Sequence, residues 1–191
     1  TNASGMYTYT VTGIAPCGAD QSVVTVTETA SPNAGTDGSI ILCSYDAVAA
    51  LFTALGGGAE AGGSWTEPGG APHGTTIDPD SDPAGVYTYT IAAVAPCAGD
   101  QAQVTVTVNA PPNAGADGAL TVCDAGAPAG LFASLSGAQV GGTWTAPGGG
   151  AFSGTYDPAI DGGGVFTYTV AGTAPCAADQ ATVTVIETGS P

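Results

Sequence analysis

Lysine and arginine are absent from this chain of 191 residues, which carries sixteen Asp and Glu residues and a single His. The formal net charge at pH 7 is therefore −16. Proteins bind nucleic acids and anionic lipid surfaces through basic side chains that displace counterions, and this chain has no Lys or Arg to offer. We expect no nucleic-acid partner, and a fold that no Lys or Arg ion pair stabilises.

Long apolar runs are missing as well. Hydrophobic residues make up 43% of the chain, but they occur in short alternating segments. None approaches the roughly 18 consecutive apolar residues that span a bilayer, so we expect no membrane span. No signal peptide is recognisable, as expected for a fragment or a mature chain. The 31 Gly and 14 Pro residues predict many turns.

The chain instead contains an internal repeat of about 80 residues. Ala-Pro-Cys ends at Cys17, Cys97 and Cys176, in steps of 80 and 79 residues. The motif Pro-Asn-Ala-Gly-x-Asp-Gly begins at Pro32 and again at Pro112. Self-similarity at a fixed period indicates a tandem array of structural units.

The repeat divides the chain into three parts. Residues 32–111 and 112–191 form two complete units, and residues 1–31 match the C-terminal part of an earlier unit. The chain therefore begins in the middle of a repeat. Two explanations stay open: the chain is a window from a longer array, or another molecule supplies the missing strands.

Each unit has the pattern of an all-β protein. Residues 86–91 and 103–108 alternate strictly between two faces, and turn residues recur every 8–12 positions. Residues 47–55 are rich in Ala and Leu, which favour a helix, but the following glycines favour a strand, with a helical turn at its start as the alternative. Six or seven short strands in 80 residues predict an immunoglobulin-like antiparallel β-sandwich.

The aromatic residues of each unit are the predicted core. Trp65 and Trp144 lie on the third strand, where immunoglobulin-like sandwiches commonly bury a large aromatic side chain. Tyr87 enters the penultimate strand as a tyrosine corner would, but the second copy has Phe at this position, so the hydroxyl is not required in every unit. The predicted core residues are Trp65, Trp144, Tyr87, Tyr89, Phe166 and Tyr168.

The segment between the units is short and contains two prolines, at residues 111 and 112. Proline fixes its own backbone angle and restricts the residue before it, so such a link is extended and stiff. We therefore expect neighbouring units to lie in line and to form a rod.

In fixed order, the segments PNAGTDGSIILC, ALFTALGG, GGSWTEPGG and GVYTYTIAAVAPCAGDQAQVTVTV cover one whole unit. Together they resemble the tandem immunoglobulin-like or PKD-like repeats of very large bacterial surface proteins. Such proteins are typical of gliding bacteria that export through a type IX secretion system, where they act as adhesins or surface filaments. The resemblance implies an extracellular location, a scaffold or attachment role and no catalytic residues. The complete absence of Lys and Arg departs from what we expect of every member.

The candidate disulfide residues are Cys17, Cys43, Cys97, Cys123 and Cys176. Their wide spacing fits no compact zinc motif, so disulfides in an oxidising compartment are the main interpretation, with buried reduced thiols as the alternative.

Three pairings of these cysteines stay open. Bonds within a unit would join Cys43 to Cys97 and Cys123 to Cys176. Bonds across unit boundaries at close sequence spacing would join Cys17 to Cys43 and Cys97 to Cys123. The third pairing follows from sandwich topology, which places Cys43 and Cys97 at opposite ends of a unit. Cys43 would then face Cys176 of the next unit, and each junction would carry one disulfide.

The weak candidates for a calcium site are carboxylates. Asp78, Asp80 and Asp82 alternate along the chain, and Asp37 and Asp117 lie in glycine-containing turns near the unit boundaries. Calcium prefers several oxygen ligands, but the second unit has Ala159 in place of Asp80. Turn and capping roles explain these residues as well, so we expect no cofactor, with calcium as the alternative. The single His73 has no accompanying nucleophile pattern, and we expect no catalysis.

Together these features predict a structural stalk in an extracellular adhesin or surface filament. Its partners would be neighbouring repeats, or other copies in a filament, and an unknown surface or glycan ligand. The alternative is a self-assembling filament subunit in which residues 1–31 complete a neighbour's sandwich. A carbohydrate-binding module is a further alternative, which would require an exposed aromatic platform.

Overall fold

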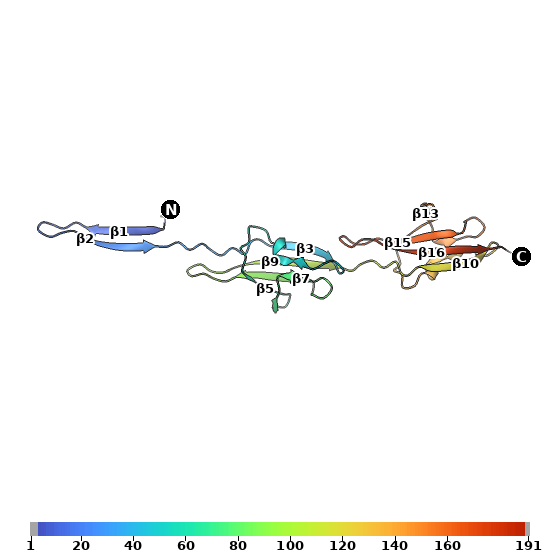
Figure 1. Ribbon diagram of the computed structural model, residues 1–191, viewed down its shortest axis with the longest axis horizontal. Helices are drawn as coiled ribbons and strands as arrows, with labels where there is room; N and C mark the ends of the chain where they lie inside the picture. The colour runs from blue at the N-terminus through green and yellow to red at the C-terminus, as the bar shows by residue number, and fades with distance from the viewer. Residues whose placement is uncertain (1–3, 190–191) are drawn as a thin grey trace.

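The computed structural model describes residues 4–189, and these residues form an all-β protein. Figure 1 shows three bodies in line along one long axis: an N-terminal hairpin, a first complete repeat and a second complete repeat. The hairpin consists of β1 (Gly5–Val11) and β2 (Asp20–Val26). Within the described range, no helix has the length and apolarity needed to cross a membrane.

The first repeat contains seven strands and one 3-10 helix. They are β3 (Gly38–Cys43), β4 (Ala49–Ala50), η1 (Leu51–Ala54), β5 (Ser64–Thr66), β6 (Pro72–His73), β7 (Thr76–Ile77), β8 (Gly85–Ile91) and β9 (Asp100–Asn109). One sheet has the strand order β3-β9-β8-β5-β6, and the facing sheet is the pair β4-β7. All pairings are antiparallel except that of β3 with β9, the first and last strands.

The second repeat follows the same plan. Its elements are β10 (Gly118–Cys123), β11 (Ala129–Gly130), η2 (Leu131–Ser134), β12 (Thr143–Thr145), β13 (Ala151–Phe152), β14 (Thr155–Tyr156), β15 (Gly164–Val170) and β16 (Asp179–Thr188). The sheets are β10-β16-β15-β12-β13 and β11-β14, and β10 pairs with β16 in parallel. The predicted fold, tandem immunoglobulin-like sandwiches, is confirmed.

One predicted strand is wrong in its extent. The sequence predicts a strand over residues 47–55, with a helical turn at its start as the alternative. Only Ala49–Ala50 is extended, and the helical turn follows it, as the 3-10 helix Leu51–Ala54. The helix turns the Leu51 side chain fully into the core. Ala and Leu tolerate this local helical geometry, and burial of Leu51 favours it over a longer strand.

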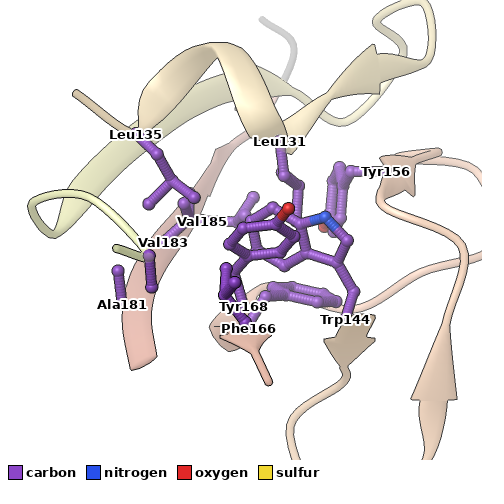
Figure 2. Packing of buried hydrophobic residues seen from close by; sticks show 11 residues of the cluster. Leu131, Leu135, Trp144, Tyr156, Phe166, Tyr168, Ala181, Val183 and Val185 are labelled. Atoms are coloured by element: carbon purple, nitrogen blue, oxygen red, sulfur yellow. The ribbon is translucent and has the colours of Figure 1, made fainter. Parts of the chain in front are cut away.

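The core of each repeat lies between its two sheets. Trp65 is 3% exposed, and its ring centroid lies 4.9 Å from that of Tyr89. The second repeat reproduces this packing with Trp144 and Tyr168, at 5.0 Å. Figure 2 shows the second core, with Trp144, Tyr156, Phe166 and Tyr168 packed against Leu131 and the valines of β16. All six aromatic residues predicted for the core are buried: Trp65, Trp144, Tyr87, Tyr89, Phe166 and Tyr168.

The tyrosine corner changes its residues between the repeats. In the first repeat the Tyr87 hydroxyl donates a hydrogen bond to the carbonyl oxygen of Pro83 at 2.7 Å. In the second repeat Phe166 takes the place of Tyr87, and Tyr156 takes the place of Ile77. The Tyr156 hydroxyl lies 3.1 Å from the carbonyl oxygen of Asp161 and 2.5 Å from the Glu187 carboxylate. Each core thus keeps one buried phenol at this end of the sandwich.

The N-terminal hairpin corresponds to β8 and β9 of a complete repeat, but it lacks the other strands that pack against them. Tyr9 of β1 occupies the position of Tyr89, yet it is 71% exposed whereas Tyr89 is 2% exposed. Val24 of β2 is likewise exposed, whereas its equivalent Val104 is buried. The face that forms the core in a complete repeat is therefore open to solvent in the hairpin.

Candidate functional site: the junction between repeats

A disulfide joins the two complete repeats. It links Cys43 of the first repeat to Cys176 of the second, with the two Cα atoms 5.0 Å apart. Both cysteines are buried, Cys43 completely and Cys176 at 5% exposure. The bond lies beside Asn109, the residue that precedes the peptide link through residues 110–112, because Cys43 pairs with Asn109 and Cys176 Sγ lies 3.4 Å from its carbonyl oxygen.

The fold brings these two cysteines to the same place from opposite directions. Cys43 is the last residue of β3, which runs toward the second repeat, and its N–H donates to Asp46 Oδ2 at 2.7 Å. Cys176 lies in the loop between β15 and β16, which reaches back toward the first repeat (Figure 1). The Cys176 N–H closes a turn on the carbonyl oxygen of Thr173 at 2.9 Å.

Polar contacts surround the disulfide. The Asn109 side-chain amide donates to the carbonyl oxygen of Ala174 at 2.8 Å. The N–H of Ala177 donates to the Tyr45 hydroxyl at 3.1 Å. These contacts join the end of the first repeat to the same loop of the second repeat that carries Cys176. The loop is therefore held by side chains and by a covalent bond.

The other two pairings are wrong. Cys43 is bonded to Cys176, which excludes the pairs Cys43–Cys97, Cys123–Cys176 and Cys17–Cys43. Cys97 is a free thiol, which excludes Cys97–Cys123. The physical reason is the length of the sandwich: the end of β3 and the loop after β8 lie at opposite ends of one repeat. The third alternative, a disulfide across the junction, is what the structure contains.

The remaining cysteines occupy equivalent positions at the other unit ends. Cys17 and Cys97 are free thiols in the loops that correspond to the loop of Cys176. Cys97 Sγ lies 3.4 Å from the carbonyl oxygen of Thr29, as Cys176 Sγ lies 3.4 Å from that of Asn109. Cys123 is exposed at the end of β10, with its sulfur 3.8 Å from Asp124 Oδ1.

The candidate calcium ligands near the unit boundaries accept backbone hydrogen bonds. Asp37 Oδ1 accepts the N–H of Gln103 at 2.8 Å, and its equivalent Asp117 accepts that of Thr182 at 2.7 Å. The hydrogen bond from Gln103 joins the start of β3 to β9, so this carboxylate helps to hold the first and last strands together.

The other calcium candidates form a turn. Asp82 Oδ2 accepts the N–H of Asp78 at 2.7 Å, and Asp78 Oδ1 accepts that of Asp80 at 3.1 Å. The second repeat keeps this turn with Asp157 and Asp161, where Ala159 replaces Asp80. Among residues 4–189, no three His, Cys, Asp or Glu side chains are grouped so as to hold a metal ion. The calcium alternative stays a prediction.

His73 packs against the core rather than facing a cleft. Its ring centroid lies 4.9 Å from that of Tyr87, edge to face, and its Nε2 atom is 3.4 Å from Asp82 Oδ2. Phe152 makes the corresponding contact with Phe166 in the second repeat, with ring centroids 4.6 Å apart. Both repeats therefore place a ring at this position against the aromatic side chain of the neighbouring strand.

Sequence reasoning did not identify Tyr45 and Asn109 as junction residues. Neither residue is repeated: the first is replaced by Ala125 in the second repeat, and Asn109 is replaced by Thr29 and Thr188 at the equivalent positions. The signal that could have found them is their position next to Cys43 and next to the prolyl link, respectively.

Comparison with solved structures agrees with the fold. A three-immunoglobulin-domain structure of titin, in an E-to-A mutated variant, aligns with 97% of this chain and 75% of its own, with TM-score 0.54 and 13% identity. An I-band fragment of titin aligns over the same shares with TM-score 0.54 and 14% identity. No protein-family model matches this chain, and no curated protein matches it by sequence. The chain is a tandem array of immunoglobulin-like domains.

Proposed function

We propose that this chain is a stalk segment of an extracellular bacterial adhesin or surface filament, in which the repeats act as a stiff spacer. The observation that carries the proposal is the disulfide between Cys43 and Cys176, which joins the two complete repeats covalently at their junction. Disulfides of this kind persist in oxidising compartments, which supports a location outside the cytoplasm. The resemblance to the repeats of gliding-bacterium surface proteins supports the bacterial cell surface.

The chemistry of the surface supports a mechanical role over a catalytic one. An open hollow beside the first repeat is lined by residues 90–93 and 99–101. The one titratable side chain in this lining is Asp100. Its carboxylate accepts the backbone N–H of Ala34 at 2.8 Å, which gives it a structural role. The net charge of −16 keeps such rods apart in solution. Trp65 and Trp144 are buried and offer no aromatic platform for a glycan.

The experiment is labelling of intact cells of the producing bacterium with an antibody raised against this chain. Surface labelling without permeabilisation is the expected result. Deleting one 80-residue repeat from the parent protein should shorten the distance from membrane to label by about 35 Å, the length of a ten-residue strand. Labelling only after permeabilisation would contradict the proposal.

A second candidate function is a filament subunit that exchanges strands between copies. The exposed core face of the hairpin favours it, because Tyr9 and Val24 are solvent-exposed while their equivalents are buried. Electron microscopy of the purified chain separates the two functions. Long polymers that a Tyr9→Asp variant fails to form would favour strand exchange, and short single rods in both samples would favour a stalk.

A further inference from the structure

The strands that enter and leave each junction all run in one direction along the rod. β2 leads through residues 27–37 into β3, which lies parallel to β9 from the pair Gly38 and Val104 to the pair Cys43 and Asn109. In the second repeat, β10 and β16 are parallel in the same way. The first and last strands of a repeat therefore both point toward the C-terminal end of the array (Figure 1).

The disulfide connects the first strand of the first repeat, β3, to the last strand of the second repeat, β16. The covalent connection does not pass through the other strands of either repeat. A covalent path runs along β2, the linker and β3 to Cys43, crosses to Cys176 and enters β16 at Asp179. The two cysteines are separated by 133 positions, so 132 residues, 44–175, lie outside this path. They include all the strands from β4 to β15, which supply most of both cores.

We propose that the Cys43–Cys176 disulfide is the tension-bearing link of the rod, and that it shields residues 44–175 from a force applied along the array. The proposal rests on the stalk function, because a stalk that holds a cell to a surface is pulled along its axis. Tension passes from β3 to β16 through covalent bonds, and no hydrogen-bonded strand pair needs to break for the force to be transmitted.

Without this bond the force would take a different route. It would enter the first repeat at the start of β3 and leave at the end of β9, so the six residue pairs between these parallel strands would be loaded in shear. Once they separate, the repeat would unfold and lengthen. The disulfide therefore converts an extensible chain of domains into a nearly inextensible one. An array with this bond at every junction would contain two such covalent paths. Each path would use the first strand of one repeat and the last strand of the next, and the two paths would be offset by one repeat.

Single-molecule pulling on the full chain, with handles at its two ends, tests the proposal. In the oxidised protein only the exposed hairpin and the linker of residues 27–37 should extend, with no unfolding step near 200 Å. In the Cys43→Ser/Cys176→Ser variant each repeat should unfold separately. Residues 38–109 at about 3.5 Å each, less a folded length of about 35 Å, give a step of roughly 200 Å per repeat.

Two controls keep the result interpretable. Cys97→Ser removes the equivalent thiol of the first repeat, leaves the disulfide in place and should behave as the oxidised wild type. Adding a reductant to wild-type molecules that are already tethered and folded should produce the two steps, even if the double variant folds poorly. Steps of about 200 Å in the oxidised wild type would overturn the proposal. Because the pulled chain is isolated from any cell, this result would leave the surface location to its own test.

Discussion

The sulfur of Cys97 lies 3.4 Å from the carbonyl oxygen of Thr29, and this contact reproduces the one between Cys176 and Asn109. The junction before the first repeat is therefore arranged like the one after it. The two junctions differ in two ways. Thr29 stands where the second junction has Asn109, and Cys97 has no disulfide partner, because the residue equivalent to Cys43 would belong to a complete unit around β1 and β2.

A chain with a second copy of residues 32–84 placed before Gly5 should complete that unit. Two thiols, Cys97 and the added copy's cysteine, should then lose two protons and two electrons to oxidised glutathione and form a second junction disulfide. Non-reducing mass spectrometry measures the bond. Replacing the added copy's cysteine by Ser is the matched control and should leave Cys97 open to alkylation. Alkylation of Cys97 at the same rate in both chains would show that the junctions are not equivalent.

Tyr89→Phe should destabilise the first repeat. The Tyr89 hydroxyl accepts the N–H of Gly63 at 2.8 Å and donates to the carbonyl oxygen of Glu60 at 2.8 Å. Loss of the hydroxyl leaves both groups without this partner, which typically costs about 1–3 kcal/mol. Tyr168→Phe removes the same pair of bonds, to Gly142 and Gln139, in the second repeat. Denaturant unfolding should show similar losses for both variants, and an unchanged midpoint would refute the role of the hydroxyl.

Alkaline pH should destabilise the protein between pH 10 and 12. Burial raises the pKa of Tyr87 to about 12, with the charges of Asp82 and Glu67 adding to the effect. Burial also raises the pKa of Tyr156 to about 12, helped by its hydrogen bond to Glu187. The folded state keeps these protons while the unfolded state loses them above pH 10, so stability is intact below pH 10 and falls toward pH 12.

Glu187→Gln isolates one part of this pH dependence. The amide oxygen can still accept the hydrogen bond from Tyr156, but the negative charge is gone, so the pKa of Tyr156 should fall toward its ordinary value. Ultraviolet titration of the tyrosines should show one buried phenol ionising earlier than in the wild type. A titration curve identical to that of the wild type would mean that Glu187 does not act on Tyr156.

Added salt should stabilise the fold. The net charge of −16 produces self-repulsion that no Lys or Arg offsets, and salt screens it with a Debye length of about 10 Å at 0.1 M. The melting temperature should therefore rise between 10 mM and 500 mM sodium chloride. The same rise with tetramethylammonium chloride would assign it to screening, whereas a rise with calcium alone at millimolar concentration would favour a bound ion at the Asp78 turn.

The sandwich could be predicted from the sequence because the long strands show a local alternation of apolar and polar residues. The alternation in residues 86–91 and 103–108 places Tyr87, Tyr89 and Val104 on one face, and the structure buries all three. The 3-10 helix at Leu51 could not be predicted in this way. Its conformation is decided by how Leu51 packs between two sheets that are distant in sequence.

The junction was only partly predictable for the same reason. Spacing alone allowed three disulfide patterns, and only the positions of Cys43 and Cys97 at opposite ends of the sandwich separate them. The contacts of Tyr45 with Ala177 and of Asn109 with Ala174 join residues from different repeats. Such contacts depend on how two folded units meet, and no periodicity in the chain encodes that arrangement.

A non-reducing peptide map of the oxidised chain shows whether the junction between the repeats carries the disulfide. An acid-specific protease suits the purpose, because trypsin has no Lys or Arg at which to cut. The map should contain two peptides joined by a disulfide, one with Cys43 and the other with Cys176. A link from Cys43 to Cys97, or from Cys123 to Cys176, would contradict this prediction, because each repeat would then be closed on itself and the junction would carry no covalent bond besides the backbone.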